Sequence, residues 1–126
     1  VTGVQTCDLP IYALWIPNDN VLLEKDIIED IWIPLLTKYK IPVSVGLELF
    51  VKPELDFGTF AVLPDHFSLG NQVAELVYEL QDNDWEFDKN SVDPPISVHK
   101  IVNYTQAKYR FGVAEKNLNN VDIILK

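Results

Sequence analysis

The sequence has little basic charge and no long hydrophobic run, and each shortage excludes a class of protein. Lysine and arginine number 10 against 19 aspartates and glutamates, which gives a formal net charge of −9. Nucleic-acid binding draws its affinity from basic side chains that neutralise phosphates, so this balance argues against a nucleic-acid partner. No apolar run approaches the roughly 20 residues that a membrane-spanning helix needs.

Sequence signatures of enzymes and metal sites are also missing. The chain has no glycine-rich phosphate loop, no GxSxG nucleophile elbow and no HExxH motif. His66 and His99 are the only histidines, and neither has further ligands at a spacing that would bind zinc. We expect His66 to be structural or to line a pocket, and His99 to be a partly buried strand residue. No cofactor, metal site or catalytic residue is predicted.

Methionine is absent, and the first 11 residues differ in character from the rest. Because the chain shows neither an initiator methionine nor a signal peptide, we expect a truncated reading frame. The opening VTGVQTCDLPI resembles the translated end of a common short-read sequencing adapter, which would place alanine at Asp8. We therefore exclude residues 1–11 from functional reasoning as non-native. Cys7, the single cysteine, lies within them and supports no disulfide, metal site or nucleophile.

The 126 residues that are present suit one soluble domain, with 48% hydrophobic and 23% charged residues. Short β-branched and aromatic runs alternate with segments whose apolar residues recur at three- and four-residue spacing, which predicts an α/β fold. The predicted strands are 12–16, 41–45, 59–63 and 97–102, and the predicted helices are 24–39, 67–80, 105–111 and 114–119. The first strand–helix–strand unit should be a crossover between parallel strands.

Three local features refine this prediction. Pro34 lies inside the first helix and removes a backbone hydrogen bond, so we expect a kink or a restart there. Asp65 precedes the second helix and is a plausible N-cap. Residues 46–58 carry little regular pattern and are predicted to be a loop.

Polar residues follow two of the predicted strands. Asn18, Asp19 and Asn20 come after the first strand, and Glu48 comes after the second. These residues can simply form turns. Alternatively, the carboxyl ends of parallel strands line the crevice where open α/β sheets bind ligands. Asp19 and Glu48 would then share one rim, as an acid–base pair or as carboxylates that hold a ligand's ammonium group. Without a nucleophile or metal motif, binding is the simpler reading.

Four segments in order carry a family resemblance: ALWIPNDN, IPVSVGLE, FGTFAVLPDHFSLG and KIVNYTQAKYRFGV. Together they resemble the carboxyl-terminal part of an ABC-transporter substrate-binding protein, of the family whose better-known members bind tryptophan or tyrosine. Two departures lie beside the presumed cleft. The usual Asp-Tyr before the long helix is Asp65-His66 here, and KPELDFGTFAVLPD is longer and more acidic than the usual connection.

The resemblance implies a periplasmic-binding-protein fold, in which two lobes with Rossmann-like parallel sheets and flanking helices close on a small ligand. This chain would supply mostly the second lobe, as residues 12–62 and 97–126. Residues 63–84 would form a hinge strand and a first-lobe helix, and 85–96 a connection. The family also implies a location in the periplasm or anchored to the cell envelope, and a membrane permease as partner.

The resemblance also implies where a ligand such as an amino acid would bind. Asp19 and Asn20 are the best placed, together with Asn18, while Glu48 and Ser44 are second choices. Asp65 is a candidate at the hinge, where its capping role competes. Phe50 and Phe60 could stack on an aromatic ligand, although core positions are the more common use of such residues.

Two other readings stay open at this point. The same fold serves as a ligand-sensing domain in regulatory and signalling proteins, which an attached DNA-binding or kinase segment would reveal. Alternatively, the chain is a fragment without activity because half its cleft is missing. An isolated second lobe should also self-associate, because large uncovered apolar patches are interaction surfaces.

Overall fold

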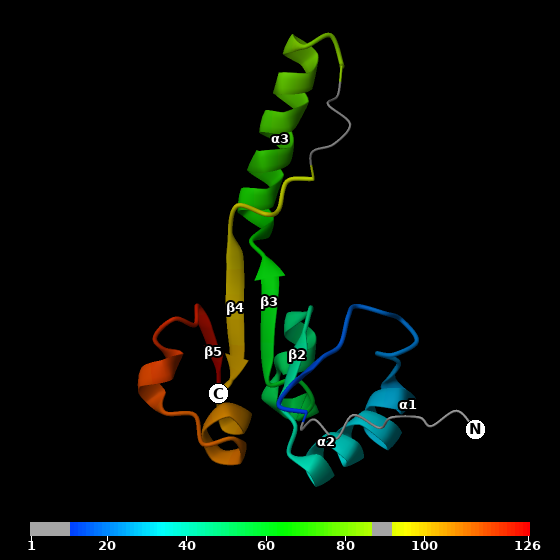
Figure 1. The fold of residues 1–126 in the computed structure, drawn as a ribbon, viewed down its shortest axis with the longest axis vertical. Coiled ribbons are helices and arrows are strands. Elements are labelled where there is room, and N and C mark those ends of the chain that lie inside the picture. Colours follow the sequence, from blue (N-terminus) through cyan, green and yellow to red (C-terminus); the bar gives the residue numbers. More distant parts are fainter. Residues whose placement is uncertain (1–10, 87–91) are drawn as a thin grey trace, which may run out of the picture.

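A computed structural model describes residues 11–86 and 92–126, so residues 1–10 of the segment predicted to be non-native and part of the 85–96 connection lie outside the description. The chain is a mixed α/β protein built on one five-stranded sheet in the order β1-β2-β3-β4-β5 (Figure 1). The strands are β1 (Leu14–Trp15), β2 (Val43–Val45), β3 (Phe60–Pro64), β4 (Val98–Asn103) and β5 (Ile123–Leu125).

The sheet is mostly parallel. β1 pairs with β2, β2 with β3 and β4 with β5 in parallel, which confirms the predicted parallel strand–helix–strand unit. β3 and β4 are antiparallel, so the prediction of a parallel sheet is wrong for this pair. Their pairing runs on to Pro64 and Val98, whereas β2 pairs with β3 only as far as Ala61. β3 and β4 therefore leave the sheet together as a two-stranded ribbon.

The two outer strands differ most from the sequence prediction. The expected buried strand 12–16 shrinks to the two residues of β1, which is an edge strand with a neighbour on one side only. Trp15 is 70% exposed, whereas Ile16 is buried. β5 was not predicted at all. It is positioned by Asp122, whose backbone N–H donates to the Lys100 carbonyl and whose side chain accepts from the Lys100 N–H.

The first helix is continuous but changes its winding around Pro34. It begins as α1 (Lys25–Ile27), becomes the π-helical segment η1 (Ile28–Trp32) and continues as α2 (Ile33–Tyr39). Proline has no N–H to donate to the carbonyl four residues earlier, and a π-turn absorbs such a defect. The Ile33 N–H instead donates to the Ile28 carbonyl, five residues back. The predicted disturbance is therefore a change of register within one helix.

Residues 46–58, predicted to be a loop, contain two short 3-10 helices. These are η2 (Glu48–Val51) and η3 (Pro53–Leu55). Val51, the last residue of η2, and Phe57, which follows η3, are buried at 0% and 2% exposure. Burial of these two side chains fixes the segment against the sheet, which a search for regular periodicity could not detect.

Two apolar clusters lie on the sheet. The larger one contains nine buried residues: Ile16, Ile28, Leu36, Val43, Val45, Val51, Phe57, Ala61 and Ile101. The smaller one joins β4 to the carboxyl-terminal segment through Val102, Ala107 and Leu118. That segment contains the π-helical η4 (Gln106–Arg110) and the 3-10 helix η5 (Glu115–Leu118), close to the two helices predicted there. Phe60 packs against the smaller cluster, so it is a core residue.

The longest helix, α3 (His66–Asp82), projects beyond the sheet from the end of the β3–β4 ribbon (Figure 1). The predicted N-cap is confirmed, because the Asp65 side chain accepts from the backbone N–H groups of Phe67 and Ser68. None of its 17 residues is buried. Its apolar residues, such as Val73 and Val77 at 52% and 44% exposure, thus have no covering layer among the residues that the structure describes. Within residues 11–86 and 92–126, no helix combines the length and apolar character needed to cross a membrane.

Candidate functional site

A small pocket lies where the parallel strands β1, β2 and β3 end. Its volume is about 300 Å³, the lower end of the range for small-molecule sites. Its lining is mainly apolar, with one amide and one hydroxyl among the side chains: Trp15, Pro17, Asn18, Ser44, Val45, Gly46, Val62 and Pro64. The carboxyl edge of a parallel sheet is the usual place for a ligand in open α/β folds.

Asn18 and Gly46 bring the ends of β1 and β2 together. The Asn18 amide donates to the Gly46 carbonyl at 3.4 Å, across 28 residues of sequence. A Cβ atom at Gly46 would lie 2.5 Å from the Asn18 Oδ1, so a larger residue there would displace the Asn18 side chain. Asn18 is exposed, and its side chain forms one wall of the pocket.

Ser44 supplies the second polar group. It is half-buried in β2, where it is in register with Trp15 on one side and Phe60 on the other. Asn18 and Ser44 therefore offer an amide and a hydroxyl, which can donate and accept hydrogen bonds with a small polar ligand. The structure thus brings together two of the six residues that the sequence predicted as ligand contacts.

Trp15, Gly46 and Val62 also line the pocket, and the sequence reading missed them. Trp15 was assigned to a buried strand. Successive side chains of a strand point to opposite faces of the sheet, so Trp15 faces away from the side on which Ile16 is buried. This alternation in the sequence could have predicted that Trp15 is exposed. Its exposed indole gives the pocket an apolar wall on which a flat group can stack.

Asp19 lies next to the pocket but its carboxylate is committed to a turn. Its Oδ1 accepts the backbone N–H groups of Val21 and Leu22, at 2.9 and 3.0 Å. This is the turn-forming alternative considered for the stretch after the first strand. Asn20 is exposed in the same turn. Neither residue is among those that line the pocket.

Glu48 is exposed at the start of η2, after the end of β2. Like Asp19, it follows a parallel strand and does not line the pocket. The use of these two carboxylates as an acid–base pair or as ligands for an ammonium group stays a prediction. Any such role would require the Asp19 carboxylate to give up hydrogen bonds to its own turn.

Asp65 is partly buried at the junction of β3 and α3. The Ser68 hydroxyl donates to its Oδ2 at 2.6 Å, and this bond lowers the pKa of the Asp65 carboxyl. The backbone N–H groups of Ser68 and Phe67, and the imidazole of His99 at 3.9 Å, lower the same pKa further. The Asp65 carboxylate is thus held in place by the hydrogen bonds with which it caps α3.

The two histidines both lie on the surface. His66 is the exposed first residue of α3. The prediction that His99 is partly buried is wrong, because its side chain is 46% exposed. It sits on the β3–β4 ribbon opposite Leu63, beyond the point where β2 stops covering β3.

A buried polar network lies near the opposite end of β3, and the sequence analysis did not predict it. The Thr59 hydroxyl accepts from the Val43 N–H at 3.2 Å and donates to the Gln106 side chain at 2.7 Å. Gln106 donates in turn to Asp56, which also accepts from Arg110 at 2.7 Å. The network joins segments about 50 residues apart in sequence, and its role in the fold is to hold η4 against the sheet.

Within the described ranges, no three His, Cys, Asp or Glu side chains lie close enough together to hold a metal ion. The polar groups that converge on the pocket are therefore the amide of Asn18 and the hydroxyl of Ser44. These groups can recognise a ligand by hydrogen bonding. Comparison of the chain with protein-family models, with curated proteins and with solved structures finds no match.

Proposed function

We propose that this chain is the ligand-binding second lobe of a solute-binding protein of an ABC-type importer, with the periplasmic-binding-protein fold. Its ligand would be a small molecule such as an amino acid, bound at the carboxyl edge of β1, β2 and β3. A membrane permease would be its partner, in the periplasm or at the cell envelope. No bond of the ligand is broken or formed.

The observation that carries this proposal is the pocket that contains Asn18 and Ser44 at the ends of two parallel strands. Its volume, apolar walls and few polar groups are typical of sites that bind small molecules. The pocket is open on one side, as expected for half of a cleft that the first lobe would close.

The β3–β4 ribbon and α3 are a second support. α3 has no buried residue, although its apolar side chains recur at helical spacing. A further layer of protein against α3 would cover these side chains. In a two-lobe protein, the ribbon that leads to α3 would be part of the hinge, since a few element-terminal residues absorb the motion when such proteins close.

The proposal is tested by a thermal-shift screen of the chain against amino acids and other small metabolites. A specific ligand at about 100 times its dissociation constant should stabilise the fold by about 2.7 kcal/mol. For a domain of this size we expect the Tm to rise by on the order of 10 °C. Asn18→Ala and Ser44→Ala should each reduce the shift.

A matched control is Asn71→Ala, which removes the same amide from the exposed surface of α3, outside the pocket. This variant should keep the full ligand-induced shift. A shift that survives in both pocket variants would place the ligand elsewhere. The absence of any shift across the panel would count against binding of amino acids by this lobe.

A further inference from the structure

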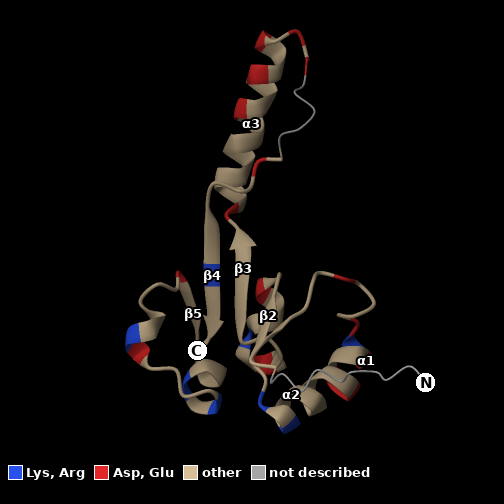
Figure 2. Ribbon diagram, in the orientation of Figure 1, with Lys and Arg blue, Asp and Glu red and all other residues tan. Residues whose placement is uncertain are grey.

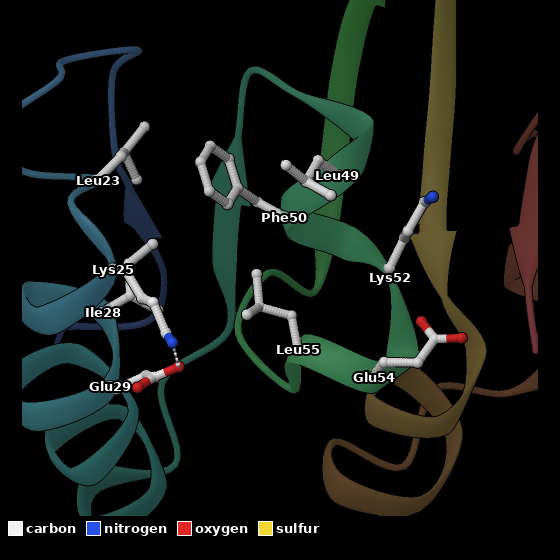
Figure 3. A pocket seen from close by; sticks show the side chains of 9 residues that line it. All are labelled: Leu23, Lys25, Ile28, Glu29, Leu49, Phe50, Lys52, Glu54 and Leu55. Carbon is white, nitrogen blue, oxygen red and sulfur yellow. Dashed lines mark ion pairs between the residues drawn. The ribbon is translucent and has the colours of Figure 1, made fainter.

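A second pocket, larger than the first, lies between the first helix and the 3-10 segments (Figure 3). Its volume is about 380 Å³. The wall on one side comes from Leu23, Lys25, Ile28 and Glu29, and on the other side from Leu49, Phe50, Lys52, Glu54 and Leu55. It shares no lining residue with the pocket at the strand ends. The two are therefore separate candidate sites.

The interior of this pocket is apolar. Leu23, Ile28, Phe50 and Leu55 reach into the gap between the two walls (Figure 3). The backbone beside them is already hydrogen-bonded: Phe50 donates to the Leu47 carbonyl, and its own carbonyl accepts from Gly58. The Leu49 carbonyl likewise accepts from the Lys52 N–H. The wall thus leaves few backbone groups to bind a polar ligand.

Four charged side chains surround the pocket, and they either pair with one another or point away from it. Lys25 and Glu29 form an ion pair at 3.9 Å on the helix side, drawn as a dashed line in Figure 3. Lys52 and Glu54 direct their charged ends away from the helix, toward β4 (Figure 3). The rim therefore carries two positive and two negative side chains, and a charged ligand gains no net attraction.

One wall of the pocket is held rigidly. The Phe50 ring packs edge-to-face on Phe57, with ring centroids 6.0 Å apart, and Phe57 is 2% exposed. Ile28, on the opposite wall, is 3% exposed and belongs to the larger core cluster. A rigid aromatic ring offers contact area at low entropic cost to a bound ring.

We propose that this pocket is a binding site for a neutral apolar small molecule that carries an aromatic ring. The ring lies between Phe50 and Ile28, against Leu23 and Leu55. This inference concerns a different site from the proposed solute cleft and stands independently of that function.

The test uses the whole chain and three probes with the same ring: fluorobenzene, 4-fluorobenzoate and 4-fluorobenzylammonium. Binding is followed by ¹⁹F NMR of each probe during titration with the protein. We expect saturable binding of fluorobenzene. Both charged probes should bind about tenfold more weakly, because a charge carried into an apolar pocket without a partner is costly.

Two variants locate the binding. Leu55→Trp fills the pocket and should weaken fluorobenzene binding by at least about tenfold. Leu49→Glu adds a charge at the mouth, and Leu49 is 59% exposed, so this variant keeps the fold and should weaken binding as well. Val73→Trp, on the exposed surface of α3, is the control and should bind fluorobenzene like the original chain. The proposal is overturned if fluorobenzene shows no saturable binding, if both pocket variants bind it unchanged, or if a charged probe binds as tightly.

Discussion

Thr59 shows how much of this fold depends on single polar side chains. It is 7% exposed, and its hydroxyl is shared between the Val43 backbone and the Gln106 side chain. Gln106 is 2% exposed and also forms a hydrogen bond with Asp56. A buried polar group that loses its partner costs more than the bond itself contributed. Loss of the Thr59 hydroxyl would therefore leave buried groups without a partner.

Thr59→Val keeps the shape of this side chain and removes the hydroxyl. The Val43 N–H and the Gln106 oxygen then lose a partner in the interior, and we expect the free energy of unfolding to fall by about 2 kcal/mol or more. Urea denaturation followed by circular dichroism measures the change. Thr105→Val makes the same substitution at an exposed position and should change stability by less than about 0.5 kcal/mol. Equal effects of the two variants would show that the buried network does not stabilise the fold.

Asp65 makes the free energy of unfolding depend on pH in the acidic range. Its folded-state pKa is lowered, chiefly by the Ser68 hydroxyl, so its stabilising effect is present at neutral pH and is lost as the pH falls through the folded pKa. Asp65→Asn keeps an N-cap but cannot titrate. We expect this variant to lose less stability than the original chain between about pH 5 and pH 2, as measured by urea midpoints. Asp93→Asn, at an exposed residue, should retain the original acid dependence. If Asp65→Asn also retains it, the carboxylate does not link folding to pH.

At the scale of the element, α3 is a helix whose hydrogen bonds are not protected by packing. Gly70 lies within it, and a Cβ atom there would meet nothing within 4 Å. Glycine in a helix is about 1 kcal/mol less favourable than alanine. Gly70→Ala should therefore slow hydrogen exchange of the α3 amides by about fivefold.

Gly58→Ala is the contrasting variant for the same measurement. A Cβ at Gly58 would lie 2.6 Å from the Phe50 carbonyl oxygen, so we expect a loss of about 1–3 kcal/mol from strain. Unchanged exchange in Gly70→Ala would show that the substitution does not stabilise α3.

The elements that the sequence predicted are those with a local signal. α3 has regular apolar spacing and an aspartate cap, and β2, β3 and β4 are β-branched runs followed by turn residues. β5 has only three residues and depends on Asp122 hydrogen bonds to a strand 22 residues earlier. The antiparallel direction of β4 also depends on long-range pairing, so no local pattern could reveal it.

The candidate site was predictable to the same extent. The polar residues after the first strand placed Asn18 at one edge of the sheet, because that inference needs only strand direction, and Ser44 was a second choice at the end of the next strand. Which turn residue would face the pocket was not predictable. The Asp19 carboxylate satisfies two N–H groups of its own turn, a local competition that strand direction cannot resolve.

The whole molecule has two unlike parts: a sheet with packed helices, and α3 on its ribbon (Figure 1). α3 contains acidic residues and no lysine or arginine, as Figure 2 shows. Its exposed apolar side chains include Phe67 at 79% and Tyr78 at 67% exposure. Such a surface favours association, while the formal charge of −9 opposes close approach of two copies.

Self-association should therefore increase with both protein concentration and salt. Salt screens the repulsion between acidic surfaces beyond a Debye length of about 10 Å at 0.1 M and leaves apolar burial in place. Sedimentation velocity measures the effect. Val73→Lys combined with Val77→Lys interrupts the apolar surface of α3, and we expect the dissociation constant to rise by at least about tenfold.

Val21→Lys, at a residue that is 71% exposed outside α3, adds positive charge without touching that surface and should leave association intact. If Val21→Lys weakens association as much as the α3 variant, charge rather than the apolar surface of α3 controls assembly. A chain that stays monomeric at high salt would show that α3 is stable in water without a covering partner.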